Sequence, residues 1–119
     1  MVTRTAPQIW LAGCLAKVDR LSALEPNWDS YGAEPVSRGS IEMAKQALRQ
    51  LALVEAIGEP FVTASPNGCV VVEWEDGGRE LEIDFLPDGR MPYIFNYGDE
   101  ERTGETSDVQ EIAAMLTGR

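Results

Sequence analysis

Five of the six carboxylates between residues 73 and 84 form the densest group of side chains in this sequence that could do chemistry. They are Glu73, Glu75, Glu80, Glu82 and Asp84. Carboxylates gathered in this way can transfer protons, ligate a divalent cation such as Mg²⁺ or Ca²⁺, or bind a basic partner. Which of these they do depends on the elements that position them.

The residues that the sequence lacks narrow the chemistry. The chain of 119 residues has no histidine, which excludes imidazole bases, Ser-His and Cys-His pairs and His-rich zinc sites. Its two cysteines, Cys14 and Cys69, form no CxxC pair, and we expect them to be buried thiols in a reducing, cytoplasmic compartment. No stretch approaches the roughly 20 apolar residues of a membrane span.

The negative charge of the chain is concentrated in its second half. The formal net charge is −10, of which residues 1–72 contribute −1 and residues 73–119 contribute −9. Binding to nucleic acid requires Lys and Arg to neutralise phosphates, so we expect no direct contact with nucleic acid. A strong negative field steers basic proteins to the half that carries it, although the same charge can serve only to keep a surface soluble.

Two amphipathic helices are predicted before the carboxylates. Residues 7–24 carry apolar side chains at helical spacing, and Pro26 cannot continue that helix. A second helix is expected from Ser37, a good N-cap, to about residue 55, with Gly58 and Pro60 closing it. With a short connector between them, they form an αα-hairpin over residues 7–55.

From Phe61 the apolar period changes from 3.6 to 2, which indicates strands over residues 61–64, 69–75 and 79–86. A two-residue turn at Gly77-Gly78 places Trp74 opposite Leu81 and keeps all the apolar side chains of both strands on one face. The same register places Glu73 opposite Glu82, and Glu75 opposite Glu80, on the other face. Like charges directly opposite are destabilising, so this face is a candidate site.

A fourth strand is expected after a hairpin loop at Pro87-Asp88-Gly89, with Tyr93, Phe95 and Tyr97 facing the core. Residues 98–106 are then expected to form an acidic loop, and Ser107 with Gln110 predicts a capping box for a last helix over residues 107–117. The fold class is therefore α+β. The N-terminal αα-hairpin packs on a four-stranded antiparallel β-meander over residues 61–97, followed by a short C-terminal helix, all in a single domain over residues 1–119.

The connector between the helices has the composition of an ordered loop. Its short polar side chains can bond the local backbone, and Gly32 can adopt a positive φ. We expect Trp28 and Tyr31 to pack the loop against the sheet. Trp28, Asp29 and Tyr31 are also the residues through which a partner could recognise this loop.

The connector segment Asn27-Trp28-Asp29-Ser30-Tyr31-Gly32-Ala33 also carries a resemblance. With Val72-Glu73-Trp74 and Leu81-Glu82-Ile83, it resembles a group of small uncharacterised bacterial proteins that share an NWDxYGA connector and an acidic EW…LEI β-hairpin. The resemblance covers about residues 18–90. It implies a bacterial or mobile-element origin and a shared fold, and it carries over no catalytic role because the group has no established activity.

We therefore expect a small acidic binding module that is not an enzyme and uses no cofactor and no metal. It would dock on a basic protein, such as a toxin or a nucleic-acid-processing enzyme, and inhibit it as an antitoxin or a phage inhibitor does. The expected contacts are the five strand carboxylates together with Asp99, Glu100 and Glu101. Two alternatives stay open: a divalent-metal-dependent hydrolase that uses the carboxylates, and a structural subunit that self-associates through apolar surface near Trp10, Trp28 and Met91.

Overall fold

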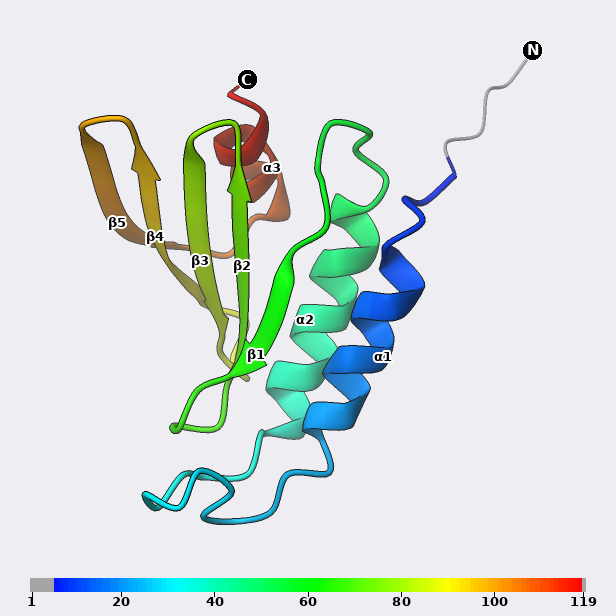
Figure 1. The fold of residues 1–119 in the computed structure, drawn as a ribbon, viewed down its shortest axis with the longest axis vertical. Helices are drawn as coiled ribbons and strands as arrows, with labels where there is room; N and C mark the ends of the chain where they lie inside the picture. Colours follow the sequence, from blue (N-terminus) through cyan, green and yellow to red (C-terminus); the bar gives the residue numbers. More distant parts are fainter. Residues whose placement is uncertain (1–5, 119) are drawn as a thin grey trace.

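A computed structural model describes residues 6–118 of the protein and shows an α+β fold. In chain order the elements are α1 (Leu11–Leu21), α2 (Arg38–Leu51), β1 (Phe61–Ala64), β2 (Val70–Asp76), β3 (Arg79–Phe85), β4 (Met91–Tyr97), β5 (Glu100–Thr106) and α3 (Val109–Thr117). The strands form one antiparallel sheet in the order β1-β2-β3-β4-β5. Helices α1 and α2 run side by side next to β1, and α3 packs near α2 and β3 (Figure 1). Within residues 6–118 no helix is both long enough and apolar enough to cross a membrane.

The helical hairpin is confirmed, but both helices are shorter than the sequence pattern predicts. Helix α1 begins at Leu11, and α2 ends at Leu51. Gln8 explains both ends, because its backbone N–H donates to the carbonyl of Ala52 and its side-chain amide donates to the carbonyl of Glu55. These bonds tie the chain before α1 to the chain after α2 and hold both segments in turns.

The hydroxyl of Ser40 joins the start of α2 to the sheet. Ser40 is fully buried, accepts from the backbone N–H of Val70 at 2.7 Å and donates to the carbonyl of Phe85. Val70 and Phe85 are opposite each other in the β2–β3 ladder. One helix side chain therefore satisfies backbone groups on both central strands and fixes where α2 sits on them.

The predicted register of the central hairpin is confirmed. Trp74 is opposite Leu81, Val72 is opposite Ile83, and Gly77 and Gly78 form the turn with φ of 58° and 84°. The core lies between the sheet and the helices, and the apolar side chains of β2 and β3 are buried in it. Because side chains alternate along a strand, the carboxylates between them point away from the helices.

Residues 98–106 do not form the predicted loop, so the sheet has five strands and not four. Gly98 and Asp99 form a turn, and all seven residues of β5 pair with β4. Six of those seven residues are exposed, and only Thr106 is buried. The strand is held by backbone pairing, and its sequence therefore shows none of the apolar alternation that identifies the other strands.

The last helix begins two residues later than predicted, because its N-cap is Asp108 and not Ser107. The Asp108 carboxylate accepts from the backbone N–H of Gln110, and Thr106 Oγ1 accepts from the N–H of Asp108. Ile112, Ala113 and Met115 of this helix are buried, whereas Val109 and Leu116 are only partly buried.

The three aromatic residues of β4 are not equally buried. The register places Tyr93 opposite Ile83 and Phe95 opposite Leu81, so both rings face the helix side of the sheet as predicted. Phe95 is buried and Tyr93 is half-buried, but 42% of Tyr97 is exposed. Tyr97 lines an open hollow beside α3 and does not belong to the core cluster.

Candidate functional site

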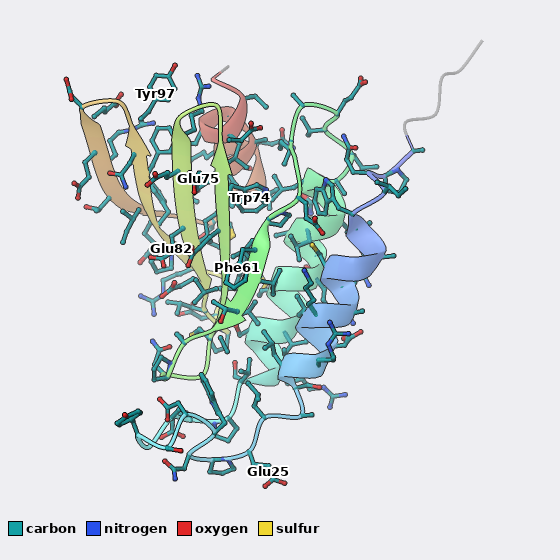
Figure 2. All side chains as sticks on the ribbon, in the orientation of Figure 1. Glu25, Phe61, Trp74, Glu75, Glu82 and Tyr97 are labelled. Carbon is teal, nitrogen blue, oxygen red and sulfur yellow. The ribbon has the colours of Figure 1, made fainter. Side chains whose placement is uncertain are left out.

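The candidate site is the sheet face that points away from the helices, called here the acidic face. Its acidic side chains come from three strands: Glu73 and Glu75 from β2, Glu80, Glu82 and Asp84 from β3, and Glu101 and Glu105 from β5. Phe61, Glu75 and Glu82 are labelled on this part of the sheet in Figure 2. Among the described strands, no Lys or Arg occupies an outward position on this face. All the charged strand side chains on this face are therefore negative.

Like charges are opposed on the two central strands. Glu73 is the cross-strand partner of Glu82, and Glu75 is the partner of Glu80. On the helix side of the same strands, apolar partners such as Trp74 and Leu81 require this register. The burial of the core thus forces the carboxylates to face one another, which costs a few tenths to about 1 kcal/mol per pair.

The charge of Glu82 affects the pKa of two neighbouring carboxyls, those of Glu73 and Asp84. Partial burial, and then the charge of Glu82 and a side-chain hydrogen bond with it, raise the pKa of the Glu73 carboxyl above its ordinary value. Burial, and then the charge of Glu82, also raise the pKa of Asp84. Both carboxyls therefore hold their protons more tightly than carboxyls in water do.

Most of these carboxylates have no cationic partner within the described chain. The ion pairs between residues 6 and 118 include only Glu105 from this face, whose Oε2 lies 3.8 Å from Arg90 Nη1. The other six acids of the face are in no such pair. Their charge is therefore available to a partner from outside.

A hollow of about 400 Å³ lies over the middle of the acidic face. The carboxylates of Glu73, Glu75, Glu80 and Glu82 line it together with Phe61 and Ile94. Glu59, which precedes β1, also contributes to its wall. The hollow is open to solvent, and its lining offers oxygen acceptors between two apolar walls.

The acids predicted on residues 98–106 do not act as one group. Asp99 lies in the β4–β5 turn, and Glu101 joins the acidic face opposite Asn96. Glu100 alternates to the helix side, where its Oε1 lies 3.3 Å from Arg102 Nε. Glu105 is not among the residues that the sequence predicts, although the alternation from Glu101 locates it once β5 is known to be a strand.

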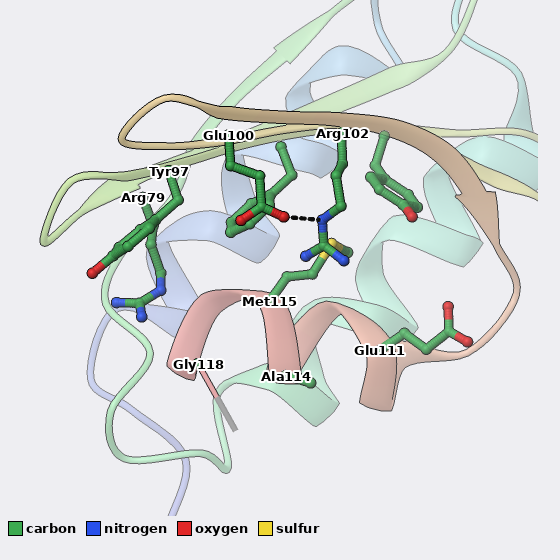
Figure 3. A pocket seen from close by; sticks show the side chains of 10 residues that line it. Arg79, Tyr97, Glu100, Arg102, Glu111, Ala114, Met115 and Gly118 are labelled. Atoms are coloured by element: carbon green, nitrogen blue, oxygen red, sulfur yellow. Dashed lines mark ion pairs between the residues drawn. The ribbon is translucent and has the colours of Figure 1, made fainter.

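A second hollow, of about 580 Å³, lies on the opposite side of the sheet between β4, β5 and α3 (Figure 3). The Arg79 guanidinium lies 4.2 Å from the centre of the Tyr97 ring, and that of Arg102 lies 5.0 Å from the centre of the Phe95 ring. Arg102 also pairs with Glu100. Each guanidinium group therefore already has a partner within the fold. The two positive charges of this hollow are thus engaged by the protein itself.

The connector holds its own conformation, and only one of its three candidate residues is free to meet a partner. Asp29 Oδ1 accepts from the N–H of Tyr31 at 2.8 Å and of Ala33 at 3.0 Å, and the Trp28 indole donates to the carbonyl of Glu34 at 2.8 Å. Trp28 and Asp29 therefore stabilise the loop itself. The prediction that Tyr31 packs against the sheet is wrong, because 92% of it is exposed.

The connector reaches the sheet through its backbone instead. Glu34 N–H donates to the carbonyl of Pro66, and Ser37 N–H donates to the carbonyl of Gly68, both in the turn between β1 and β2. The loop is thereby attached at one end of the sheet.

This geometry gives little support to the two alternative functions, a metal-dependent hydrolase and a self-associating structural subunit. Within residues 6–118, no group of three or more His, Cys, Asp or Glu side chains is arranged to hold one metal ion. Trp10 and Met91, expected near an apolar association surface, are 9% and 1% exposed and belong to the core. Trp28 is engaged with Glu34, so these three residues form no continuous apolar patch.

No protein-family model, curated protein or solved structure matches this chain.

Proposed function

We propose that this protein is a non-enzymatic binding module whose acidic face docks on a basic protein surface and blocks it. One observation carries the proposal: seven acidic strand side chains share a face on which the described strands place no basic one. A surface that serves only solubility mixes both signs, because interspersed charges avoid repulsion.

The electrostatics of the face support binding rather than catalysis. Glu73 and Glu82 repel each other in the free protein, and a cation placed between them would relieve that repulsion and gain charge-assisted hydrogen bonds. At physiological salt the Debye length is about 8 Å, so an individual opposed pair attracts a partner only at close range. The summed charge of the whole face guides the approach of the partner. The hollow over this face is open to solvent and excludes little water, which disfavours acid-base catalysis in it.

The partner that fits this face is a protein whose own ligand is a polyanion. Rows of carboxylates present regularly spaced negative charge to Lys and Arg, as a phosphate backbone does. The function is therefore that of an antitoxin-like or phage or mobile-element inhibitor of a toxin or nucleic-acid-processing enzyme, consistent with the bacterial origin that the NWDxYGA resemblance implies.

Capture of partners from a lysate of the organism that encodes the chain tests this function. The wild type is compared with a Glu73→Lys, Glu82→Lys variant. The control is Glu25→Lys, Glu42→Lys, which changes net charge equally on exposed residues of the connector and α2. We expect the wild type and the control to recover a basic protein that duplex DNA displaces, and the face variant to lose it. Equal recovery by all three proteins would show that the acidic face is not the binding surface.

A further inference from the structure

Two exposed apolar side chains interrupt the acidic face, and both lie in the same cross-strand row. Phe61 is 64% exposed and Ile94 is 42% exposed. Single exposed apolar residues are common on protein surfaces. These two, however, flank the Glu73–Glu82 pair, because Phe61 is opposite Glu73 in β1–β2 and Ile94 is opposite Glu82 in β3–β4.

The side chains of the row are therefore apolar on β1, acidic on β2, acidic on β3 and apolar on β4. Neighbouring strands are about 4.8 Å apart, which places the four positions at roughly 0, 5, 10 and 14 Å along a line across the strands. The 400 Å³ hollow lies over this row and has both apolar side chains in its walls. A partner that covers the row must present two basic groups between two apolar ones at that spacing.

We propose that the occupant of this row is an amphipathic basic helix of the partner, lying across the strands; this inference rests on the proposed function. A helix rises 1.5 Å per residue, so residues i, i+3, i+7 and i+10 lie at about 0, 4.5, 10.5 and 15 Å. All four project from one side of the helix. The matching pattern is apolar at i and i+10, with Arg or Lys at i+3 and i+7.

An extended segment fits the row less well than a helix. Side chains on one face of a strand recur every second residue, or about 6.6 Å, so four of them span roughly 20 Å against the 14 Å of the row. A nucleic acid is excluded by charge, since the carboxylates of the row would repel its phosphates and no basic side chain would neutralise them. Arg suits the two basic positions because its planar guanidinium can bind both Glu73 and Glu82 and can also stack on Phe61.

Two designed peptides of equal composition test the inference. Each is a 16-residue helix in an Ala and Gln background with Arg at i+3 and i+7. The matched peptide has Leu at i and i+10, whereas the shuffled peptide has Leu at i+5 and i+12, on the opposite side of the helix. Fluorescence anisotropy at about 0.15 M salt measures both affinities for the wild-type protein. We expect the matched peptide to bind at least about tenfold more tightly, since two apolar contacts are added to equal charge.

Variants of the protein locate that difference on the row. Phe61→Ser, Ile94→Thr should reduce binding of the matched peptide to the level of the shuffled one. The matched control is Ile9→Ser, Leu53→Ser, which removes two apolar side chains that are 96% and 47% exposed elsewhere and should keep the preference. Melting curves check that each variant is folded. The single variant Ile94→Thr, which remains β-branched, should lose part of the preference even if the double variant is unstable.

Each other outcome overturns the inference. If both peptides bind equally and Glu73→Lys, Glu82→Lys abolishes the binding of both, the face binds positive charge but does not distinguish the apolar pattern of the helix. The proposed function then stands. If neither peptide binds, the occupant is not such a helix, and partner capture alone decides the proposed function. If the control variant loses the preference as the row variant does, the apolar contacts lie outside the row.

Discussion

Glu73 and Glu82 face each other directly across β2 and β3, and the pKa of Glu73 is raised above its ordinary value of 4.5. The opposition follows from the core, since Val72, Trp74, Leu81 and Ile83 all bury their side chains on the other face of the same two strands. The fold thus keeps a repulsive pair at the centre of the surface that we propose for binding.

Glu73→Gln should stabilise the protein at neutral pH. The folded state holds the Glu73 proton more tightly than the unfolded chain does, so this carboxyl opposes folding at pH 7, where it is ionised. The free energy of unfolding should rise by a few tenths to about 1 kcal/mol in urea titrations at pH 7. The gain should disappear as the pH falls below 4.5, because both states of the wild type are then protonated.

Glu100→Gln is the matched control for that experiment. It removes the same charge from a strand, but on the helix side of the sheet and next to Arg102. Since this exposed pair is weakly attractive, we expect no gain at pH 7. Equal stabilisation by both substitutions would mean that net charge, not the opposed pair, sets the effect.

Ser40→Ala should destabilise the fold although it removes a single oxygen atom. The substitution leaves the N–H of Val70 and the carbonyl of Phe85 without their buried partner, which costs about 1–3 kcal/mol. Ser22→Ala serves as the control, because the exposed Ser22 hydroxyl donates only to Asp19 three residues earlier and its loss should cost less than about 0.5 kcal/mol. Thermal unfolding curves that show equal losses would contradict this role of Ser40.

Two glycines in the first turns of helices should respond to alanine in opposite directions. A Cβ at Gly39 would lie 2.8 Å from Cβ of Pro87, so Gly39→Ala forces α2 away from the β3–β4 turn and should cost about 1–3 kcal/mol. A Cβ at Gly13 meets nothing within 4 Å, so Gly13→Ala should stabilise α1 by up to about 1 kcal/mol. Chemical denaturation measures both, and stabilisation by Gly39→Ala would refute the close packing.

Asp29 and Tyr31 should differ sharply in their effect on stability. Asp29→Ala removes the acceptor for two backbone N–H groups and should cost about 1–2 kcal/mol, whereas Asp29→Asn keeps an oxygen there and should recover part of the loss. Tyr31→Ala should change stability by less than about 0.5 kcal/mol because the side chain is exposed. Urea unfolding of the three variants checks the order, and a cost for Tyr31→Ala equal to that of Asp29→Ala would show that Tyr31 also holds the loop.

The sequence by itself determined the central hairpin and the charge on its outer face. The apolar alternation of β2 and β3, with two glycines between them, allows only one register in which all the apolar side chains meet the core. The positions of Glu73, Glu75, Glu80, Glu82 and Asp84 follow from that register. The N-cap at Ser37 can likewise be predicted from the sequence, because it depends on contacts within one turn of the chain.

Only the tertiary structure decided how far the acidic face extends and what flanks it. Strand β5 is held by backbone pairing to β4, and because its side chains are mostly exposed they leave no period-2 pattern in the sequence. This pairing sends Glu101 and Glu105 to the acidic face and Glu100 to Arg102 on the other side. The row from Phe61 to Ile94 also crosses four strands, so it joins residues whose proximity depends on long-range pairing and not on local spacing.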